Sequence, residues 1–535
     1  MGNDLRDGLK DEFFRVVILF VLSLVFFLIF RTPHYIGAAD EFSYTYLAMK
    51  IANFESPFMI NELGIPTKFL APRLFAVNLL DQIIPVYSWG WPIIFALFYG
   101  FFGDVGMFIA NPIIGSLGAV FMYLLGARFF NRKIALFSYL FLVINPIYWN
   151  FVESSYSEVS SAVFVLIGLY FFLRSQDRGE VVNGVISALF LGYSVLIRYT
   201  NVLVFFSIFL VILSEKFIKV KLKGRWKLFV IYSAFLFLTV TVILFGNKLL
   251  FGDYFTTGYA LNVGRDFQNS FSLFNLVKNL PFYLLGLLIE IPVLSLFVVP
   301  SLKSVPRQRR LLWVLTILIS SVYILVYSAY PWLVYEVWNF IRFLLPIFPL
   351  LILFSTAYIF EKINWNKGKW VLVAVVVVSF LVGFVQLGAF KYTSERTALI
   401  GEKVNELTEP GSIVITYTYD KSIGSELYGN RTTIRPFNYN LEEFGPVIEE
   451  LLDQGLDLYL FIDKGAGGMT EIRTAPKENF EDGWSIRYTT SYILNDINST
   501  YELDKDEFSI EIRPFYPFIP FLVNEKYELY KIEES

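Results

Sequence analysis

Two adjacent carboxylates, Asp40 and Glu41, are the first candidates for chemistry in this sequence, because they follow closely on its first long apolar segment. Carboxylates beside lipid are costly to bury, so such a pair is either solvated or functional. An acidic pair is also an ordinary start for a short helix, where the helix dipole favours negative charge. Charge alone favours the second interpretation, and the neighbouring sequence has to decide between them.

The composition indicates a membrane protein. Of the 535 residues, 56% are hydrophobic and 17% are charged, whereas a soluble domain averages about 45–50% apolar and about 25% charged residues.

The absence of cysteine excludes disulfides, thiolate nucleophiles and cysteine-bound metal centres. The single histidine, His34, excludes a multi-histidine metal site and is expected to be an interfacial side chain. The net charge of −3 gives no indication of a nucleic-acid partner, because the positive charge lies in short loops.

Apolar segments long enough to cross a bilayer recur along the chain. A crossing takes about 20 residues, and only helices can satisfy such a segment's backbone polar groups in lipid. We expect about eleven transmembrane helices on this criterion. They are Phe14–Arg31, Val105–Phe130, Ile134–Phe151, Val159–Arg174, Val182–Ile197, Val202–Leu213, Leu228–Leu249, Phe282–Ser301, Leu311–Tyr330, Phe340–Phe360 and Trp370–Phe390.

The segment between the first two of these helices, residues 31–104, is predicted to be a long external loop. Glu41–Ala52 and Pro72–Ile84 are expected to form short helices within it. Trp91–Phe102 is apolar but too short to span, which is typical of an interfacial or re-entrant piece.

Lysine and arginine concentrate in alternate loops, such as Asn131–Lys133, Lys216–Lys227 and Lys303–Arg310. The loops between them are acidic or aromatic. Because short loops rich in lysine and arginine stay on the cytoplasmic side, the pattern predicts a multi-pass protein of the cell (plasma) membrane. Its N-terminus is expected in the cytoplasm and its C-terminal domain outside.

The polar tail, residues 391–535, is predicted to be a domain separate from the membrane module of residues 1–390. A strand is expected at Ser412–Tyr419, a helix at Leu441–Gln454 and a second strand at Leu456–Ile462. This order indicates a small α/β domain. The predicted fold class is therefore a polytopic α-helical membrane protein with a small extracytoplasmic α/β domain at its C-terminus.

Five short motifs occur in order along the apolar part of the chain. They are Asp40-Glu41-Phe-Ser-Tyr44-Thr-Tyr46, Tyr87-Ser-Trp-Gly90-Trp91-Pro92, Asn145-Pro146 with Tyr156-Ser157-Glu158, Phe251-Gly252-Asp253-Tyr254 with Gly258-Tyr259, and Arg342-Phe-Leu-Leu-Pro346. This series resembles the GT-C membrane glycosyltransferases, the superfamily that includes the protein O-mannosyltransferases (dolichyl-phosphate-mannose-protein mannosyltransferases) and the lipid A aminoarabinose transferases. Ser88 and Trp89 depart from the family's pattern, which has two prolines there. The C-terminal tail carries no family signature.

The resemblance implies inverting transfer of a sugar from a polyprenyl-phosphate donor to an external glycan, lipid or protein. It places a catalytic acid in the Asp40-Glu41 pair, and Asp40 is expected to be the general base, a role worth about 10²–10⁴-fold in rate. Arg342 and Arg198, at predicted outer helix ends, are candidates to bind the donor phosphate, because arginine binds phosphate bidentately. Either could instead be an interfacial arginine whose charge reaches water, and for Arg198 that interpretation is favoured.

Glu158 could orient the acceptor or help bind a cation, and its ordinary interpretation is a solvated loop acid. Some members of the superfamily use a divalent cation, for which Asp40 and Glu158 are the candidate ligands here; no other cofactor is expected. Tyr44, Tyr259 and Trp338 are candidates to line the substrate site, although most aromatic residues of these loops should belong to the interfacial belt.

A secondary transporter or lipid-sugar flippase is the alternative from another functional class. Transporters commonly contain internal repeats, and their ionisable groups or broken helices lie at mid-membrane. No repeat is evident in this sequence, and its ionisable residues gather at the predicted outer surface, so the transferase is favoured. An oligosaccharyltransferase would share the fold, but its Trp-Trp-Asp signature is absent from the tail.

Overall fold

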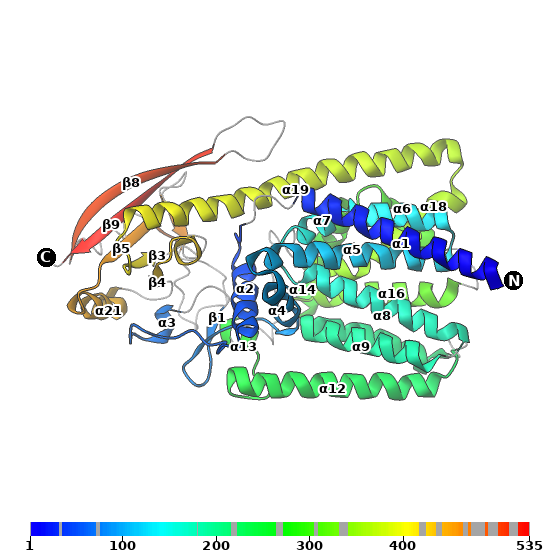
Figure 1. Cartoon of the computed structure of the whole chain (residues 1–535), viewed down its shortest axis with the longest axis horizontal. Helices are drawn as coiled ribbons and strands as arrows, with labels where there is room; N and C mark the ends of the chain where they lie inside the picture. The colour runs from blue at the N-terminus through cyan, green and yellow to red at the C-terminus, as the bar shows by residue number, and fades with distance from the viewer. Residues whose placement is uncertain are drawn as a thin grey trace.

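The computed structural model of the chain shows a bundle of long helices with a small mixed domain at one end, and its two termini lie at opposite ends of the long axis (Figure 1). The structure describes residues 2–30, 35–70, 75–178, 180–215, 222–263, 271–303, 309–330, 341–416, 424–434, 441–463, 469–471, 487–489, 501–512 and 523–533.

The elements before residue 255 are α1 Gly2–Phe30, α2 Ala39–Ala52, α3 Thr67–Leu70, β1 Phe75–Val77, β2 Ile83–Pro85, α4 Gly90–Phe102, α5 Asp104–Phe129, α6 Arg132–Val143, α7 Pro146–Val152, α8 Glu158–Arg178, α9 Val181–Ile197, η1 Tyr199–Asn201, α10 Val202–Leu213 and α12 Arg225–Phe251. Those after it are α13 Gly258–Val263, α14 Leu273–Glu290, η3 Leu294–Phe297, α15 Val298–Lys303, α16 Arg310–Ser328, η6 Ile341–Ile347, α18 Phe348–Lys362, α19 Trp365–Leu407, β3 Ile413–Thr416, β4 Thr432–Ile434, α21 Leu441–Asp453, β5 Leu458–Asp463, β6 Met469–Glu471, β7 Arg487–Thr489, β8 Glu502–Ile512 and β9 Val523–Glu533.

The chain is a multi-pass membrane protein. In the part that the structure describes, eight helices are long and apolar enough to cross a bilayer, and α6 with α7 makes a ninth if this bent pair is one span. The bend of 61° falls at Asn145-Pro146, where Asn145 caps α7 by accepting a hydrogen bond from the Tyr148 amide and proline occupies the first turn. The two other predicted spans are the shorter helices α9 and α10.

One predicted span has different bounds in the structure. The apolar segment Phe282–Ser301 was expected to be a single helix, but α14 begins at Leu273 and ends at Glu290. Val293 then adopts a positive φ of 64°, a backbone conformation that breaks a helix, and two short helices follow. Hydropathy alone does not detect such a break, because the residues on both sides of it are apolar.

The first loop (residues 35–70 and 75–102) lies across the end of the bundle that faces the mixed domain, with α2 nearly perpendicular to the long helices in Figure 1. The helix predicted at Pro72–Ile84 is wrong over residues 75–84, and Pro72–Leu74 lie outside the described residues. Strands β1 and β2 form an antiparallel hairpin there, with Phe75 opposite Pro85, and Asp81 has a positive φ of 58° in the connection. The tip of the hairpin is tied to the end of α12, because Asn78 donates a hydrogen bond to the Leu250 carbonyl at 2.9 Å.

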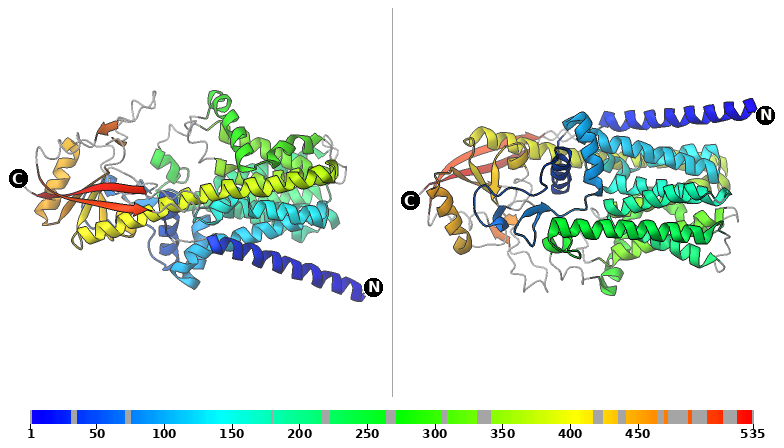
Figure 2. Two further views of the ribbon diagram at one scale, coloured as in Figure 1. Left: turned by 90° about the horizontal axis from the view of Figure 1, so that it is seen from above. Right: turned by 60° about the horizontal axis from the view of Figure 1, so that its bottom comes forward.

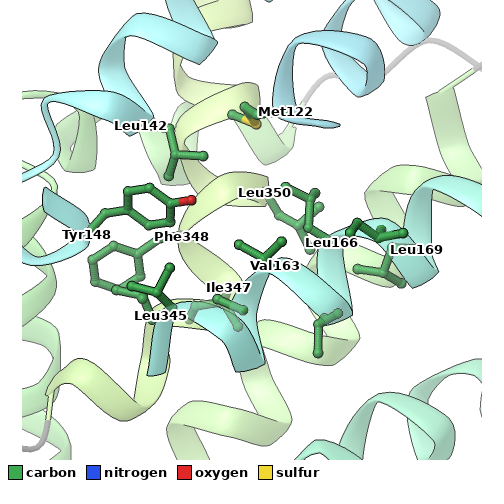
Figure 3. Close-up of a cluster of buried hydrophobic side chains, with 14 of the residues drawn as sticks. Met122, Leu142, Tyr148, Val163, Leu166, Leu169, Leu345, Ile347, Phe348 and Leu350 are labelled. Carbon is green, nitrogen blue, oxygen red and sulfur yellow. The ribbon is translucent and has the colours of Figure 1, made fainter. Parts of the chain in front are cut away.

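The bundle core lies beneath this loop. Leu345, Ile347 and Phe348 cluster with Val163 and Leu166 of α8 (Figure 3). These side chains are at most 2% exposed, and close packing of this kind fixes the position of η6 at the end of the bundle. Helix α1, by contrast, lies along one flank of the bundle (Figure 2).

The C-terminal domain (the described residues from Ile413 onward) is built on a five-stranded sheet of order β4-β3-β5-β9-β8. Strands β3, β4 and β5 are parallel, and β9 and β8 add an antiparallel edge. Successive side chains along a strand point to opposite faces of the sheet, so both faces are apolar. Val414 and Phe461 pack on α19, whereas Ile413 and Leu460 pack with α21. The predicted strand, helix and strand correspond to β3, α21 and β5. Helix α19 passes unbroken through the predicted domain boundary at residue 390.

Candidate active site

Asp40 lies in the first turn of α2. Its Oδ2 accepts a hydrogen bond from Arg342 Nη2 at 2.9 Å. Among the described residues, Arg342 is the only hydrogen-bond partner of the Asp40 side chain, so its second oxygen, Oδ1, is free to accept a further group. The side chain is 13% exposed, so Asp40 is not completely buried.

Arg342 is held by η6 between two carboxylates. While its Nη2 contacts Asp40, its Nε lies 3.2 Å from Glu158 Oε1. The second contact is an ion pair without hydrogen-bond geometry, so the Nε–H is not satisfied by the described residues. The guanidinium also lies over the ring of Tyr156, at 4.8 Å, which favours a cation at this place.

Glu158 and Arg198 come from the facing ends of two adjacent helices. Glu158 begins α8, and Arg198 follows the last residue of α9 in an extended conformation. Arg198 Nη1 lies 2.9 Å from Glu158 Oε1 and donates to Ser157 Oγ at 3.2 Å. A single carboxylate oxygen therefore bridges the two arginines. The other oxygen, Oε2, is buried and has no hydrogen-bond partner in the described part of the chain.

Tyr44 closes the cluster on the side of α2. Its hydroxyl is 2.8 Å from Ser157 Oγ, and it lies one helical turn after Asp40, so both side chains face the same way. Its ring stacks on Tyr87 with the centroids 4.5 Å apart, and Tyr87 in turn meets Tyr259 edge to face at 5.5 Å. Two carboxylates, two guanidiniums and an aromatic wall thus meet at one place. We call Asp40, Tyr44, Ser157, Glu158, Arg198 and Arg342 the site cluster.

The environment of the site cluster strengthens its charges. Arg342 and Arg198 are 14% and 15% exposed, and Glu158 only 2%. Charges removed from water in this way interact more strongly than on a surface. Two positive and two negative side chains balance, which is the usual requirement for burying charge. An arriving anion would therefore meet two fixed guanidiniums that need little rearrangement.

Glu41, the residue after Asp40, contacts backbone amides. Its Oε1 accepts a hydrogen bond from the Ser155 amide at 2.7 Å and its Oε2 accepts one from the Gly37 amide at 3.2 Å. The residue is fully buried. These contacts favour an anchoring role, joining α2 to the loop between α7 and α8, over the catalytic role that its position beside Asp40 suggested.

Known proteins resemble this chain in both sequence and fold. Residues 84–245 match the family model described as dolichyl-phosphate-mannose-protein mannosyltransferase. The structure is similar to that of ArnT from Cupriavidus metallidurans bound to undecaprenyl phosphate, with a TM-score of 0.54 and 13% identity over 84% of this chain and 93% of that chain. It is also similar to the oligosaccharyltransferase of Archaeoglobus fulgidus in the apo form, with a TM-score of 0.56 and 12% identity over 84% and 69%. The search of curated proteins gave no match.

The chain has the GT-C fold. The resemblance drawn from five short motifs is thereby confirmed at the level of the fold. Together the family match and the fold support a membrane glycosyltransferase.

The fold brings together five of the predicted site residues, Asp40, Tyr44, Glu158, Arg198 and Arg342. Tyr259 joins through Tyr87, and Trp338 lies outside the described residues, as does His34. Tyr87 was expected only as part of a family motif and not as a site residue. Phe343, whose ring lies 4.5 Å from the Arg198 guanidinium, was not expected at the site either. Phe343 directly follows Arg342, so a search for aromatic neighbours of the candidate cations could have found it.

The resemblance implied one candidate cofactor, a divalent cation with Asp40 and Glu158 as ligands. Each of these carboxylates faces an arginine instead. No group of three or more histidine, aspartate or glutamate side chains suited to a metal occurs in the described ranges. The described residues therefore supply no set of metal ligands around Asp40 and Glu158.

Proposed function

We propose that this protein transfers a sugar from a polyprenyl-phosphate donor to a hydroxyl acceptor at the outer face of the membrane. The observation that carries the proposal is the placement of Arg342 and Arg198 beside Asp40. It joins a base to a pair of phosphate-binding cations at the end of the bundle nearest the C-terminal domain. Two similar structures support the donor class, because ArnT was solved with undecaprenyl phosphate and an archaeal oligosaccharyltransferase with a dolichol-phosphate.

The outer face follows from the distribution of lysine and arginine in the loops, which puts the C-terminal domain outside. Nucleotide sugars are cytosolic, so a transferase that works outside needs a sugar already carried across on a lipid. A polyprenyl chain would lie in the bilayer and bring its phosphate to the membrane boundary. The acceptor can be a glycan, a lipid or a protein.

The reaction we infer is a single displacement. Asp40 takes the proton of the acceptor hydroxyl as this oxygen bonds to the anomeric carbon of the sugar. The bond from that carbon to the phosphate oxygen breaks, and its electron pair leaves with the polyprenyl phosphate. Arg342 and Arg198 stabilise the charge that develops on the departing phosphate, a preorganised contribution that needs no rearrangement during the reaction. One displacement inverts the anomeric centre.

The test is sugar transfer from labelled polyprenyl-phosphate sugars by the purified full-length protein. Asp40→Asn should lower kcat by at least about 100-fold, the typical contribution of a general base, at a temperature where the variant is folded. Asp104→Asn, which removes an exposed acid in the first turn of α5, should transfer at the wild-type rate. Equal activity of Asp40→Asn would exclude Asp40 as the base. Absence of transfer by the wild type from every such donor would contradict the function itself.

A further inference from the structure

The first loop and the C-terminal domain share one hydrophobic core. Ile36 and Phe42 of the loop are buried in the same cluster as Ile415 of the sheet. The ring of Phe69, in α3, lies 5.3 Å from that of Phe444, in α21. Apolar side chains that are removed from water together stabilise each other's positions, so the domain and the loop that carries Asp40 are one packed unit.

Within this unit, Tyr428 of the C-terminal domain forms hydrogen bonds with the backbone just before α2. Its hydroxyl accepts a hydrogen bond from the Ile36 amide at 2.6 Å and can donate one to the Ile36 carbonyl at 3.2 Å. Its ring meets that of Tyr35 edge to face, with the centroids 5.8 Å apart. One side chain of the domain therefore satisfies both backbone polar groups of a residue four positions before Asp40.

The next residue, Gly37, is held by two further side chains. Its amide donates to Glu41 at 3.2 Å, and its carbonyl accepts a hydrogen bond from Thr397 Oγ1 of α19 at 3.4 Å. A Cβ atom on Gly37 would overlap the Ser394 backbone, so only glycine lets the loop approach α19 this closely. All four backbone polar groups of Ile36 and Gly37 thus bond to side chains, which leaves the segment little freedom.

Tyr428 is itself fixed against α19. The segment that carries Tyr428 packs closely on Gly401 of α19. A Cβ atom at Gly401 would overlap the Gly424 carbonyl and Tyr428 Cβ. Three residues after Tyr428, Arg431 donates from Nε to Thr408 Oγ1 and from Nη2 to the Thr408 carbonyl, both at 2.8 Å, at the end of α19. Tyr428, which hydrogen-bonds the loop, is therefore held in place by a helix that is continuous with the membrane bundle.

We propose that the C-terminal domain positions the catalytic base, with Tyr428 as the positioning residue that holds Ile36 and thereby the first turn of α2. This inference rests on the function proposed above for Asp40. The two arginines stand on other elements, η6 and the end of α9. Loosening the segment should therefore misplace the base without weakening donor binding, and small displacements of a reacting group have large kinetic costs.

Tyr428→Phe tests this, because it removes the hydroxyl and keeps the ring. We expect amide hydrogen exchange within residues 35–42 of the full-length protein to become about tenfold faster, as loss of a hydrogen bond of typical strength allows. We also expect kcat to fall by about tenfold or more, with the KM for the donor unchanged. The matched control is Tyr501→Phe, whose hydroxyl donates within the domain to the Gly445 carbonyl at 3.3 Å. It should leave both measurements at wild-type values.

Thr397→Val provides a second variant that acts on Gly37 from α19, should Tyr428→Phe fold poorly. Wild-type exchange in residues 35–42 in a folded variant would overturn the proposal, whether or not activity falls. Faster exchange with unchanged kcat would overturn it as well, because the segment would then not position the base. If the wild type transfers no sugar, the proposed function fails. Faster exchange in Tyr428→Phe would still show that the C-terminal domain restrains residues 35–42.

Discussion

Arg342 Nη2 lies 2.9 Å from Asp40 Oδ2, although the two residues are 302 positions apart in the chain. The same guanidinium faces Glu158 through its Nε. Under the proposed function, one arginine therefore contacts the base and also stabilises the departing phosphate.

Arg342→Lys should impair donor binding although it preserves the charge. The two contacts of Arg342 come from different nitrogens of one planar group, and a single ammonium cannot reproduce that geometry. We expect kcat/KM for the donor to fall by about 10–100-fold, corresponding to a charged hydrogen bond of about 1.5–3 kcal/mol. Arg309→Lys is the matched control, because Arg309 contacts Glu361 and the Phe129 carbonyl away from the site cluster. Wild-type kinetics for Arg342→Lys would rule out a phosphate-binding role.

Glu158→Gln should destabilise the protein in a way that anions reverse. The substitution leaves two buried arginines without the carboxylate between them, and breaking a buried pair costs about 3–5 kcal/mol. Inorganic phosphate or a polyprenyl phosphate can supply the missing charge, so either should raise the Tm of the variant more than that of the wild type. Glu361→Gln, which breaks a more exposed pair, should change stability by at most about 1 kcal/mol. A Glu158→Gln protein that is as stable as wild type and insensitive to phosphate would contradict this account of the cluster.

Glu41→Gln separates anchoring from catalysis. The carboxylate accepts hydrogen bonds from two backbone amides, and the NH2 group of glutamine cannot accept either of them. The resulting unsatisfied amide should cost about 1–3 kcal/mol, seen as a lower Tm in detergent. At a temperature where the variant is folded, kcat should fall far less than in Asp40→Asn. A variant of wild-type Tm with a loss of kcat as large as that of Asp40→Asn would restore Glu41 as a catalytic residue.

Tyr44 offers a test by pH. Burial is the main reason why the pKa of Tyr44 is raised in the folded protein above its ordinary value, which is about 10. As pH rises past about 10, the unfolded chain therefore ionises first and the folded state loses stability. Tyr44→Phe should lose less stability than wild type between neutral pH and about pH 11, measured by denaturant unfolding. An identical decline in both proteins would show that Tyr44 is not the shielded phenol that its contacts describe.

Much of the site could be predicted from the sequence, because most of its residues stand at helix ends. Asp40, Glu158, Arg198 and Arg342 each lie beside an apolar segment on the side where basic loops are absent, so all four were expected at one surface. Their pairing could not be predicted. Which carboxylate oxygen bridges which guanidinium depends on how α8, α9 and η6 pack, and a single sequence carries no signal for that.

The errors arose where local pattern competed with contacts from distant residues. Pro72–Ile84 has the spacing of a short helix, but its backbone pairs within a hairpin whose tip is held by Leu250 of α12. The role of Tyr428 was equally hidden. Its position in the tail carries no motif, and its partner, Ile36, belongs to the other end of the sequence.

Helix α19 has a further consequence. Its 43 residues run unbroken from the membrane bundle into the C-terminal domain, a length of about 65 Å at the usual helical rise. Inserting a single residue near Lys391 would turn everything beyond it by about 100°, and Thr397 would no longer face Gly37. An insertion of about seven residues, close to two full turns, would restore the facing direction but lift the domain by about 10 Å. The spacing between bilayer and domain is thus set in steps of the helical repeat, and a change in its length also changes the angular register of the domain.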